Sequence, residues 1–196
     1  VTAQKGLDAK SLDFVCRVAD VLSEKTPKLR LIACNGTASV EQLLTLKAHG
    51  VKAYNHNLET SKRFYPQICT THSWQERYET CKNVKEAGLM LICGGIFGLG
   101  ESHEDRVQML EAIESLKPIS VPINFYHHNK ALELEPNPLS VDEALELVAL
   151  SRKMVPDAQR IMVAGGRELM FGERECEIFT HGANSIVIGN YLTTMG

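Results

Sequence analysis

The stretch LMLICGGIFGLGESHEDRVQMLEAIESL, residues 89–116, decides the fold class. Its first part, residues 89–97, is an apolar run typical of a buried strand, and residues 103–116 have the spacing of an amphipathic helix. Ser102 stands where a helix N-cap is preferred. The segment therefore predicts one β/α unit. The glycines inside it indicate a bulge, a close backbone approach by a ligand, or a plain turn into the helix.

The same alternation of strand and helix continues on both sides of this unit. Further strands are predicted at residues 29–34, 51–57, 120–126, 160–164 and 185–190. Helices are predicted at residues 12–22, 40–49, 74–87 and 140–154, with a weaker one at 174–181. Further N-caps are expected at Ser39, Ser73 and Ser140, and helix ends at Gly50 and Gly88. About six strand–helix units joined by short connections predict a parallel α/β sheet.

Two closures of such a sheet compete. An open doubly wound sheet usually carries a phosphate fingerprint after its first strand, and none is found here. A parallel β/α (TIM-type) barrel has eight units and typically about 250 residues. We favour a single β/α-barrel domain over residues 1–196, incomplete, with about six of eight units present. The chain is expected to be a piece of a longer protein, truncated at both ends.

The composition is that of an ordinary globular protein. Of the 196 residues, 44% are apolar and 23% charged, which excludes collagen, low-complexity disorder and coiled coils. No apolar run approaches the roughly 20 residues of a membrane helix. The net charge is −3 and the basic residues are dispersed, so nucleic acid is not an expected partner. With no secretory signal in view, we expect a cytoplasmic protein whose six cysteines are reduced.

The carboxyl ends of the predicted strands carry the polar residues. After the strand at 51–57, Asn55, Asn57 and Glu59 fall on one face by strand alternation. These three residues suit a site for a ligand rich in hydroxyl and amide groups. They suit equally well an internal polar layer whose groups hydrogen-bond to one another. His56, between them, is expected to face the surrounding helices. Other strand ends carry Asn124 and the pair Thr193 and Thr194, which suit a small polar head group such as a urea; the threonine pair suits a helix cap equally well.

Seven segments, in order along nearly the whole chain, resemble the biotin synthases of the radical S-adenosylmethionine superfamily. They are YNHNLETS (54–61), ICTTH (68–72), RYET (77–80), GGIFGLGE (94–101), VPIN (121–124), AGGRE (164–168) and YLTT (191–194). The resemblance implies a β/α barrel. It also implies reductive cleavage of S-adenosylmethionine at a 4Fe–4S cluster and hydrogen abstraction from dethiobiotin by the 5′-deoxyadenosyl radical. A second iron–sulfur cluster would then donate sulfur.

The resemblance also implies roles for individual residues. The S-adenosylmethionine site would consist of Asn57 and Glu59 at the ribose, Ile96 at the adenine, Arg77 near the methionine carboxylate, and the backbone of Gly94 and Gly95. Dethiobiotin would be bound by Asn55, Asn124, Thr193 and Thr194. No side chain is assigned as catalytic, because a reactive radical requires tight positioning more than acid–base help.

The cluster positions depart from the family pattern. The CxxxCxxC loop that binds the 4Fe–4S cluster is absent from the 196 residues, so its ligands are expected outside this chain and the piece is expected to be inactive alone. For the second cluster (2Fe–2S or a variant), Ile32 and Met162 occupy positions where cysteine and arginine are usual. Cys34, two residues after Ile32 and on the same face, is the better metal-ligand candidate. Cys93 is the weaker one because it faces the other way unless a bulge re-aims it.

Three functions remain open at this stage. The leading one is biotin synthase, with flavodoxin or ferredoxin as electron donor and a homodimer as the full protein. The second is a related radical enzyme that does not insert sulfur. The third is a non-catalytic barrel that binds a small ligand.

Overall fold

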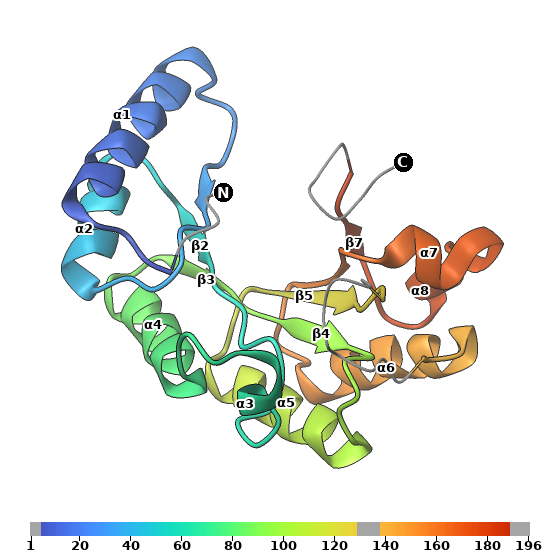
Figure 1. Cartoon of the computed structure of the whole chain (residues 1–196). Coiled ribbons are helices and arrows are strands. Elements are labelled where there is room, and N and C mark those ends of the chain that lie inside the picture. The colour runs from blue at the N-terminus through green and yellow to red at the C-terminus, as the bar shows by residue number, and fades with distance from the viewer. Residues whose placement is uncertain (1–4, 129–137, 189–196) are drawn as a thin grey trace. The chain divides into compact units, whose positions relative to one another are not determined.

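The computed structural model describes residues 5–128 and 138–188, and Figure 1 labels its helices and strands. The chain divides into two units. The first consists of residues 1–56 and 71–92, and the second of residues 57–70 and 93–196.

The first unit alternates helices with parallel strands. Along the chain it contains α1 (Ala9–Lys25), β1 (Ile32–Ala33), α2 (Val40–Ala48), β2 (Ala53–Asn55), α4 (Trp74–Glu86) and β3 (Met90–Ile92). Strand β2 lies between β1 and β3, with Ala53 opposite both Ile32 and Met90. Helices α1 and α2 lie side by side (Figure 1).

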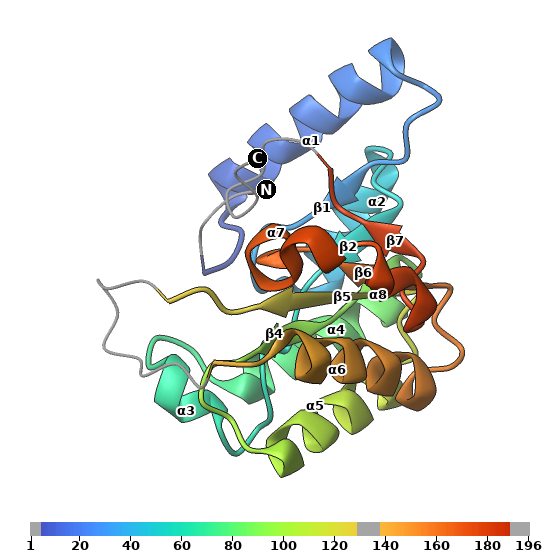
Figure 2. The same cartoon turned by 90° about the vertical axis from the view of Figure 1, so that its right-hand side faces the viewer.

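The second unit repeats this pattern. It contains α3 (Tyr65–Ile68), β4 (Gly95–Phe97), α5 (His103–Ser115), β5 (Ser120–Phe125), α6 (Val141–Met154), β6 (Arg160–Val163), α7 (Arg167–Phe171), a 3₁₀ turn η1 (Gly172–Arg174), α8 (Glu177–Thr180) and β7 (Ser185–Ile186). These strands are also parallel, in the order β4, β5, β6, β7. Helices α5 and α6 run side by side in Figure 2. Its core includes Phe97, Phe125 and Phe171, and the Phe125 ring packs against both of the others.

The predicted helix boundaries are confirmed at the serine N-caps. The side chain of each of these serines accepts a hydrogen bond from the backbone N–H three residues later. The serine's own backbone N–H donates to the side chain of that later residue, which forms a capping box. The pairs are Ser39 with Gln42, Ser73 with Glu76, Ser102 with Asp105 and Ser140 with Glu143. Gly50 and Gly88 have φ angles of +94° and +68°, the left-handed conformation expected just after a helix.

The prediction of one continuous strand over residues 89–97 is wrong, because β3 ends at Ile92 and β4 begins at Gly95. At Gly94 a Cβ atom would collide with the carbonyl group of Pro122, so the chain passes too close to β5 for any side chain. The Gly94 carbonyl accepts a hydrogen bond of 3.0 Å from the Leu58 N–H. The glycines therefore permit a close approach of the chain to its own backbone.

The weak helix predicted over residues 174–181 is also corrected. The structure contains η1 and the short α8 there, and it adds α7 and α3, which the sequence pattern did not predict. Gly172, with a φ of +51°, ends α7, and η1 begins at the same residue.

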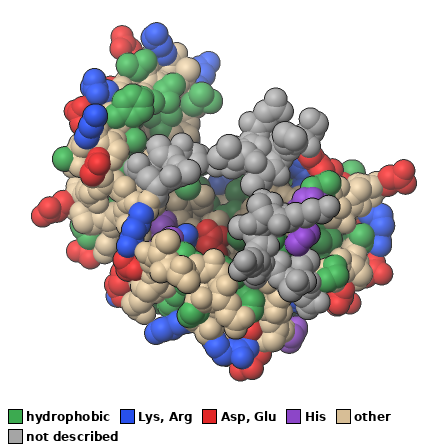
Figure 3. All heavy atoms as spheres, viewed as in Figure 1, with side chains coloured by type: hydrophobic (Ala, Val, Ile, Leu, Met, Phe, Trp, Pro, Cys, Tyr) green, Lys and Arg blue, Asp and Glu red, His purple; other side chains and the backbone are tan. Residues whose placement is uncertain are grey.

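Helix α1 carries an apolar stripe on its surface. Phe14 and Val21 are 57% and 48% exposed, and Figure 3 shows apolar side chains gathered where α1 forms the surface. Across the described part of the chain, no helix combines the length and apolarity that crossing a membrane requires.

Candidate active site

Residues 54–60 alternate in burial as predicted. Tyr54, His56, Leu58 and Thr60 are buried, whereas Asn55, Asn57 and Glu59 are each half-buried. Asn55, Asn57 and Glu59 are therefore the less buried residues of this segment, as strand alternation predicts. Glu59 has a φ of +69°, so at this residue the chain turns out of the extended conformation.

Four predicted site residues come together in the second unit. The Asn57 Oδ1 atom accepts a hydrogen bond of 3.2 Å from the Gly94 N–H. The Glu59 carbonyl accepts one of 2.7 Å from the Ile96 N–H, and Ile96 is paired with Asn124 across β4 and β5. Asn57, Glu59, Ile96 and Asn124 therefore all lie next to the backbone of residues 94–96.

Asn124 joins two further backbone segments. Its Nδ2 atom donates to the Gly95 carbonyl at 3.1 Å, and its Oδ1 atom accepts from the Gly165 N–H at 2.8 Å. The side chain thus has a structural role, and it remains half-buried rather than fully enclosed. An amide oxygen has two lone pairs and an amide nitrogen two hydrogens, so one acceptor and one donor remain for a ligand.

Ile96 is the most accessible residue of β4. It is half-buried, whereas its neighbours Gly95 and Phe97 are buried. At Gly95 a Cβ atom would meet the Met109 side chain and lie 2.9 Å from the Glu59 carbonyl oxygen, so this position also accommodates only glycine.

The first unit contains the candidates Cys34, Asn55 and Arg77. Cys34 and Ile32 are more exposed than Ala33 and Asn35, which confirms that they share a face. The Asn55 Nδ2 atom lies 3.6 Å from the Cys34 sulfur, and the buried Asn55 Oδ1 atom has no hydrogen-bond partner among the described residues. A buried, unpaired amide oxygen costs about 1–3 kcal/mol, so a ligand N–H would stabilise it.

His56 is buried among protein groups, in agreement with its predicted orientation. It is 5% exposed, and the Cys81 thiol on α4 donates to its carbonyl. Burial, reinforced by charge on Arg77 and His72, lowers the pKa of the His56 imidazole from 6.5 to about 3. The ring is neutral near pH 7. Arg77 itself is half-buried on α4.

The two cysteines predicted as cluster ligands differ in burial. Cys93 has no exposed surface, and its N–H donates to the Ser120 carbonyl. Cys34 is half-buried. Among the residues that the structure describes, no three histidine, cysteine or acidic side chains are placed to hold a metal ion. Thr193 and Thr194 lie outside the described residues.

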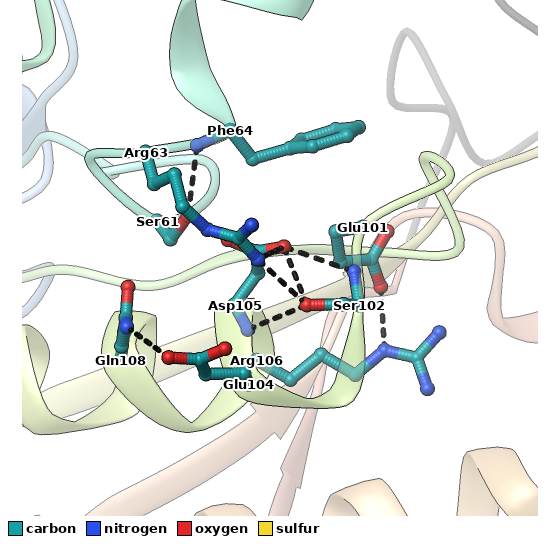
Figure 4. A network of polar contacts seen from close by, with 9 residues as sticks. All are labelled: Ser61, Arg63, Phe64, Glu101, Ser102, Glu104, Asp105, Arg106 and Gln108. Carbon is teal, nitrogen blue, oxygen red and sulfur yellow. Dashed lines mark hydrogen bonds and ion pairs between the residues drawn. The ribbon is translucent and has the colours of Figure 1, made fainter.

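Two buried acids, Glu101 just before the N-cap of α5 and Asp105 in the first turn, were not predicted as functional residues from the sequence; Figure 4 shows both. Glu101 is 2% exposed; its Oε1 atom accepts from the Gly98 N–H at 2.9 Å and from Arg106 Nε at 2.7 Å. Asp105, also 2% exposed, is bound by Ser61 and Arg63. The position of Asp105 three residues after the cap Ser102 was the only available signal, and it indicates a helix start rather than a long-range contact.

Comparison with solved structures shows the fold. The chain is similar to methylornithine synthase (PylB), with a TM-score of 0.75 and 16% identity over 90% of this chain and 52% of that one. It is also similar to the FeFe-hydrogenase maturase HydG from Carboxydothermus hydrogenoformans, with a TM-score of 0.78 and 17% identity over 90% of this chain and 43% of that one. The predicted class, a partial parallel β/α barrel, is confirmed.

Comparison of sequences shows the family. Residues 13–113 match the Radical SAM superfamily, and residues 122–196 match the Biotin and Thiamin Synthesis associated domain. The whole chain is 75% identical to the biotin synthase of Sulfurimonas denitrificans, covering 70% of that protein. It is 60% identical to the biotin synthase of Aliarcobacter butzleri, covering 69% of it. The chain therefore belongs to the biotin synthase family of radical SAM proteins.

Proposed function

We propose that this chain supplies the S-adenosylmethionine and dethiobiotin sites of an enzyme that inserts sulfur into dethiobiotin to form biotin. The main support is the convergence of Asn57, Glu59, Ile96 and Asn124 on the backbone of Gly94 and Gly95. Asn57 and Asn124 reach this backbone through their side-chain amides, and Glu59 reaches it through its main-chain carbonyl. Two amides, an apolar side chain and an acidic residue on adjoining backbone suit a ligand that combines a ribose, a heterocycle and a cyclic urea.

The S-adenosylmethionine residues would each make a different contact. The Glu59 carboxylate accepts hydrogen bonds from both ribose hydroxyls, because an ionised carboxylate has several acceptor positions. Ile96 offers apolar surface to the adenine, and Asn57 is held in a fixed orientation by the Gly94 N–H. Arg77 binds the methionine carboxylate by a charge-assisted hydrogen bond. When bound, S-adenosylmethionine supplies the hydrogen-abstracting chemistry, and these side chains bind and orient it.

Dethiobiotin would be bound by amides and hydroxyls. Asn124 uses its remaining donor and acceptor, and the unpaired Oδ1 atom of Asn55 accepts a ureido N–H. Thr193 and Thr194 complete the proposed set. All four groups are uncharged, which fits a neutral urea and leaves the reacting carbons free of acid–base groups.

The described residues do not by themselves fit an iron–sulfur cluster, because they contain no group of three potential ligands. The 4Fe–4S cluster of the family would take its ligands from outside the described chain, which has no CxxxCxxC loop. For the second cluster we retain Cys34 as the better proposed ligand and Cys93 as the weaker one. Metal analysis of a Cys34→Ser variant tests this: an unchanged iron and sulfide content would exclude Cys34.

The remaining proposals concern the electron donor, the oligomeric state, the location in the cell and the extent of the domain. We propose flavodoxin or ferredoxin as electron donor, a homodimer, a cytoplasmic location and one barrel domain spanning residues 1–196. Their support is the family membership.

The substrate assignment is tested by two matched asparagines. Asn184 bridges backbone groups as Asn124 does: its Oδ1 atom accepts from the Ile161 N–H, and its Nδ2 atom donates to the Gln159 carbonyl. In the protein expressed from its complete reading frame and loaded with its clusters, Asn124→Ala should raise the KM for dethiobiotin about tenfold or more, since one good hydrogen bond is lost. Asn184→Ala should lower stability but leave that KM unchanged.

Three outcomes are informative. Equal KM values in the two variants would overturn the role of Asn124. Complementation of a biotin auxotroph by the wild type would support sulfur insertion. Radical-dependent cleavage of S-adenosylmethionine without complementation would indicate a related radical enzyme instead.

A further inference from the structure

Glu59 has a backbone conformation that its surroundings must maintain. Among the described residues other than glycine, only Glu59 and Lys117 have positive φ angles, +69° and +48°. The left-handed conformation is unfavourable for a residue with a Cβ atom. The bond from the Ile96 N–H to the Glu59 carbonyl fixes one side of this residue. The other side depends on the segment that follows it.

The following segment is fastened to the first turn of α5 through Asp105 (Figure 4). The Ser61 hydroxyl donates to Asp105 Oδ1 at 2.6 Å. The Arg63 guanidinium donates to both carboxylate oxygens, with Nε at 3.1 Å from Oδ1 and Nη2 at 2.7 Å from Oδ2. Ser61 Oγ also accepts from the Phe64 N–H at 3.0 Å, so the segment closes on itself where it meets the helix.

The carboxylate of Asp105 is well suited to this task. It also accepts from the Ser102 N–H and hydroxyl, at 3.0 Å and 2.7 Å, and thereby completes the cap of α5. Burial raises the pKa of Asp105, but the hydrogen bonds from Ser61, Ser102 and Arg63 outweigh burial and hold the pKa at about 2. A permanent negative charge at the N-terminus of a 13-residue helix is also favoured by the helix dipole.

The residue just before the N-cap of α5 fixes the end of the strand that carries Ile96. Glu101, at the start of α5, binds the Gly98 N–H just after β4 and forms a buried ion pair with Arg106. The segment bearing Glu59 and the strand bearing Ile96 are therefore both anchored within residues 101–106. Displacement of either anchor would change the backbone that presents the two groups.

We propose that Asp105 is a positioning residue: through Ser61 and Arg63 it holds the Glu59 backbone in the left-handed conformation, and so sets the affinity for the ribose of S-adenosylmethionine. This inference rests on the proposed function of Glu59. A carboxylate that accepts two adjacent hydroxyls at once tolerates little rotation, so a small change in its backbone weakens both hydrogen bonds.

The experiment uses Ser61→Ala in the cluster-loaded protein expressed from its complete reading frame. This change removes the bond from Ser61 to Asp105 and the bond from the Phe64 N–H to Ser61 Oγ, and it leaves the capping box of Ser102 and Asp105 in place. The dissociation constants of S-adenosylmethionine and of its 2′-deoxyribose analogue are measured for each variant. Ser61→Ala should weaken S-adenosylmethionine binding about five- to tenfold, and the analogue much less, so discrimination between the two ligands falls. Ser140→Ala, which weakens the capping box of α6, controls for a loss of stability and should preserve the discrimination.

Two further variants make each outcome decisive. If Ser61→Ala does not fold, Arg63→Gln replaces it, because the Arg63 side chain is 59% exposed and its loss leaves no cavity. Glu59→Gln, measured in parallel, should reduce the discrimination, and adding Ser61→Ala to it should reduce it no further. Discrimination that is lost in Glu59→Gln but kept in the Ser61 and Arg63 variants would overturn the positioning role alone. Discrimination that survives in Glu59→Gln would overturn the ribose assignment, and the positioning role with it.

Discussion

Replacing His56 by glutamine should make the stability of this protein less sensitive to acid. The imidazole is 5% exposed, and no described residue forms a hydrogen bond with its Nε2 atom. Its pKa is 6.5 ordinarily and about 3 in the folded chain, since burial and nearby positive charge oppose protonation.

The magnitude follows from the difference between the two pKa values. Between about pH 3 and pH 6.5 the unfolded chain binds a proton at His56 that the folded chain does not. The free energy of unfolding therefore falls as the pH drops through this window and is unaffected above it. At about 1.4 kcal/mol per pH unit, acidification from pH 7.5 to pH 5 should cost about 2 kcal/mol through this residue.

The assay is urea unfolding at several pH values. Trp74 is the single tryptophan and lies in the same unit as His56, so its fluorescence reports on the relevant part of the chain. His56→Gln should be destabilised at pH 7.5 and should then lose about 2 kcal/mol less than the wild type on moving to pH 5. His103→Gln, at an exposed histidine, provides the reference for losing an imidazole from the surface. A constant difference between wild type and His56→Gln at all pH values would refute the reasoning.

Three other substitutions test the packing and the caps. Asp105→Asn should cost about 2 kcal/mol at pH 7 and almost nothing near pH 2. The depressed pKa of about 2 gives stability that is fully present above about pH 4 and is lost as the pH falls to 2; thermal unfolding at pH 7 and pH 2 measures it. Gly94→Ala should lower stability by more than about 2 kcal/mol because the new Cβ meets the Pro122 carbonyl, a backbone group that cannot rotate away. A melting temperature equal to that of the wild type would contradict the close approach at Gly94. Ser140→Ala should cost about 1 kcal/mol in chemical denaturation, and no change would show that the α6 capping box contributes nothing.

The local pattern of the sequence determined the order of strands and helices. Serine at Ser39, Ser73, Ser102 and Ser140 marks helix starts because its hydroxyl binds a backbone N–H only three residues away. Strand alternation likewise placed Asn55, Asn57 and Glu59 on one face. These interactions span a few residues, so their residue types and spacing are visible in one dimension.

Contacts between distant segments were decided only by the tertiary structure. Ser61 and Asp105 are 44 positions apart, and nothing near either residue predicts their bond. The interruption of the strand at Gly94 depends on the carbonyl group of Pro122, and the orientation of the Asn124 amide depends on Gly95 and Gly165. Periodicity specifies which face a side chain occupies. Which backbone meets that face is set by how the strands and helices pack, and that packing depends on all of them together.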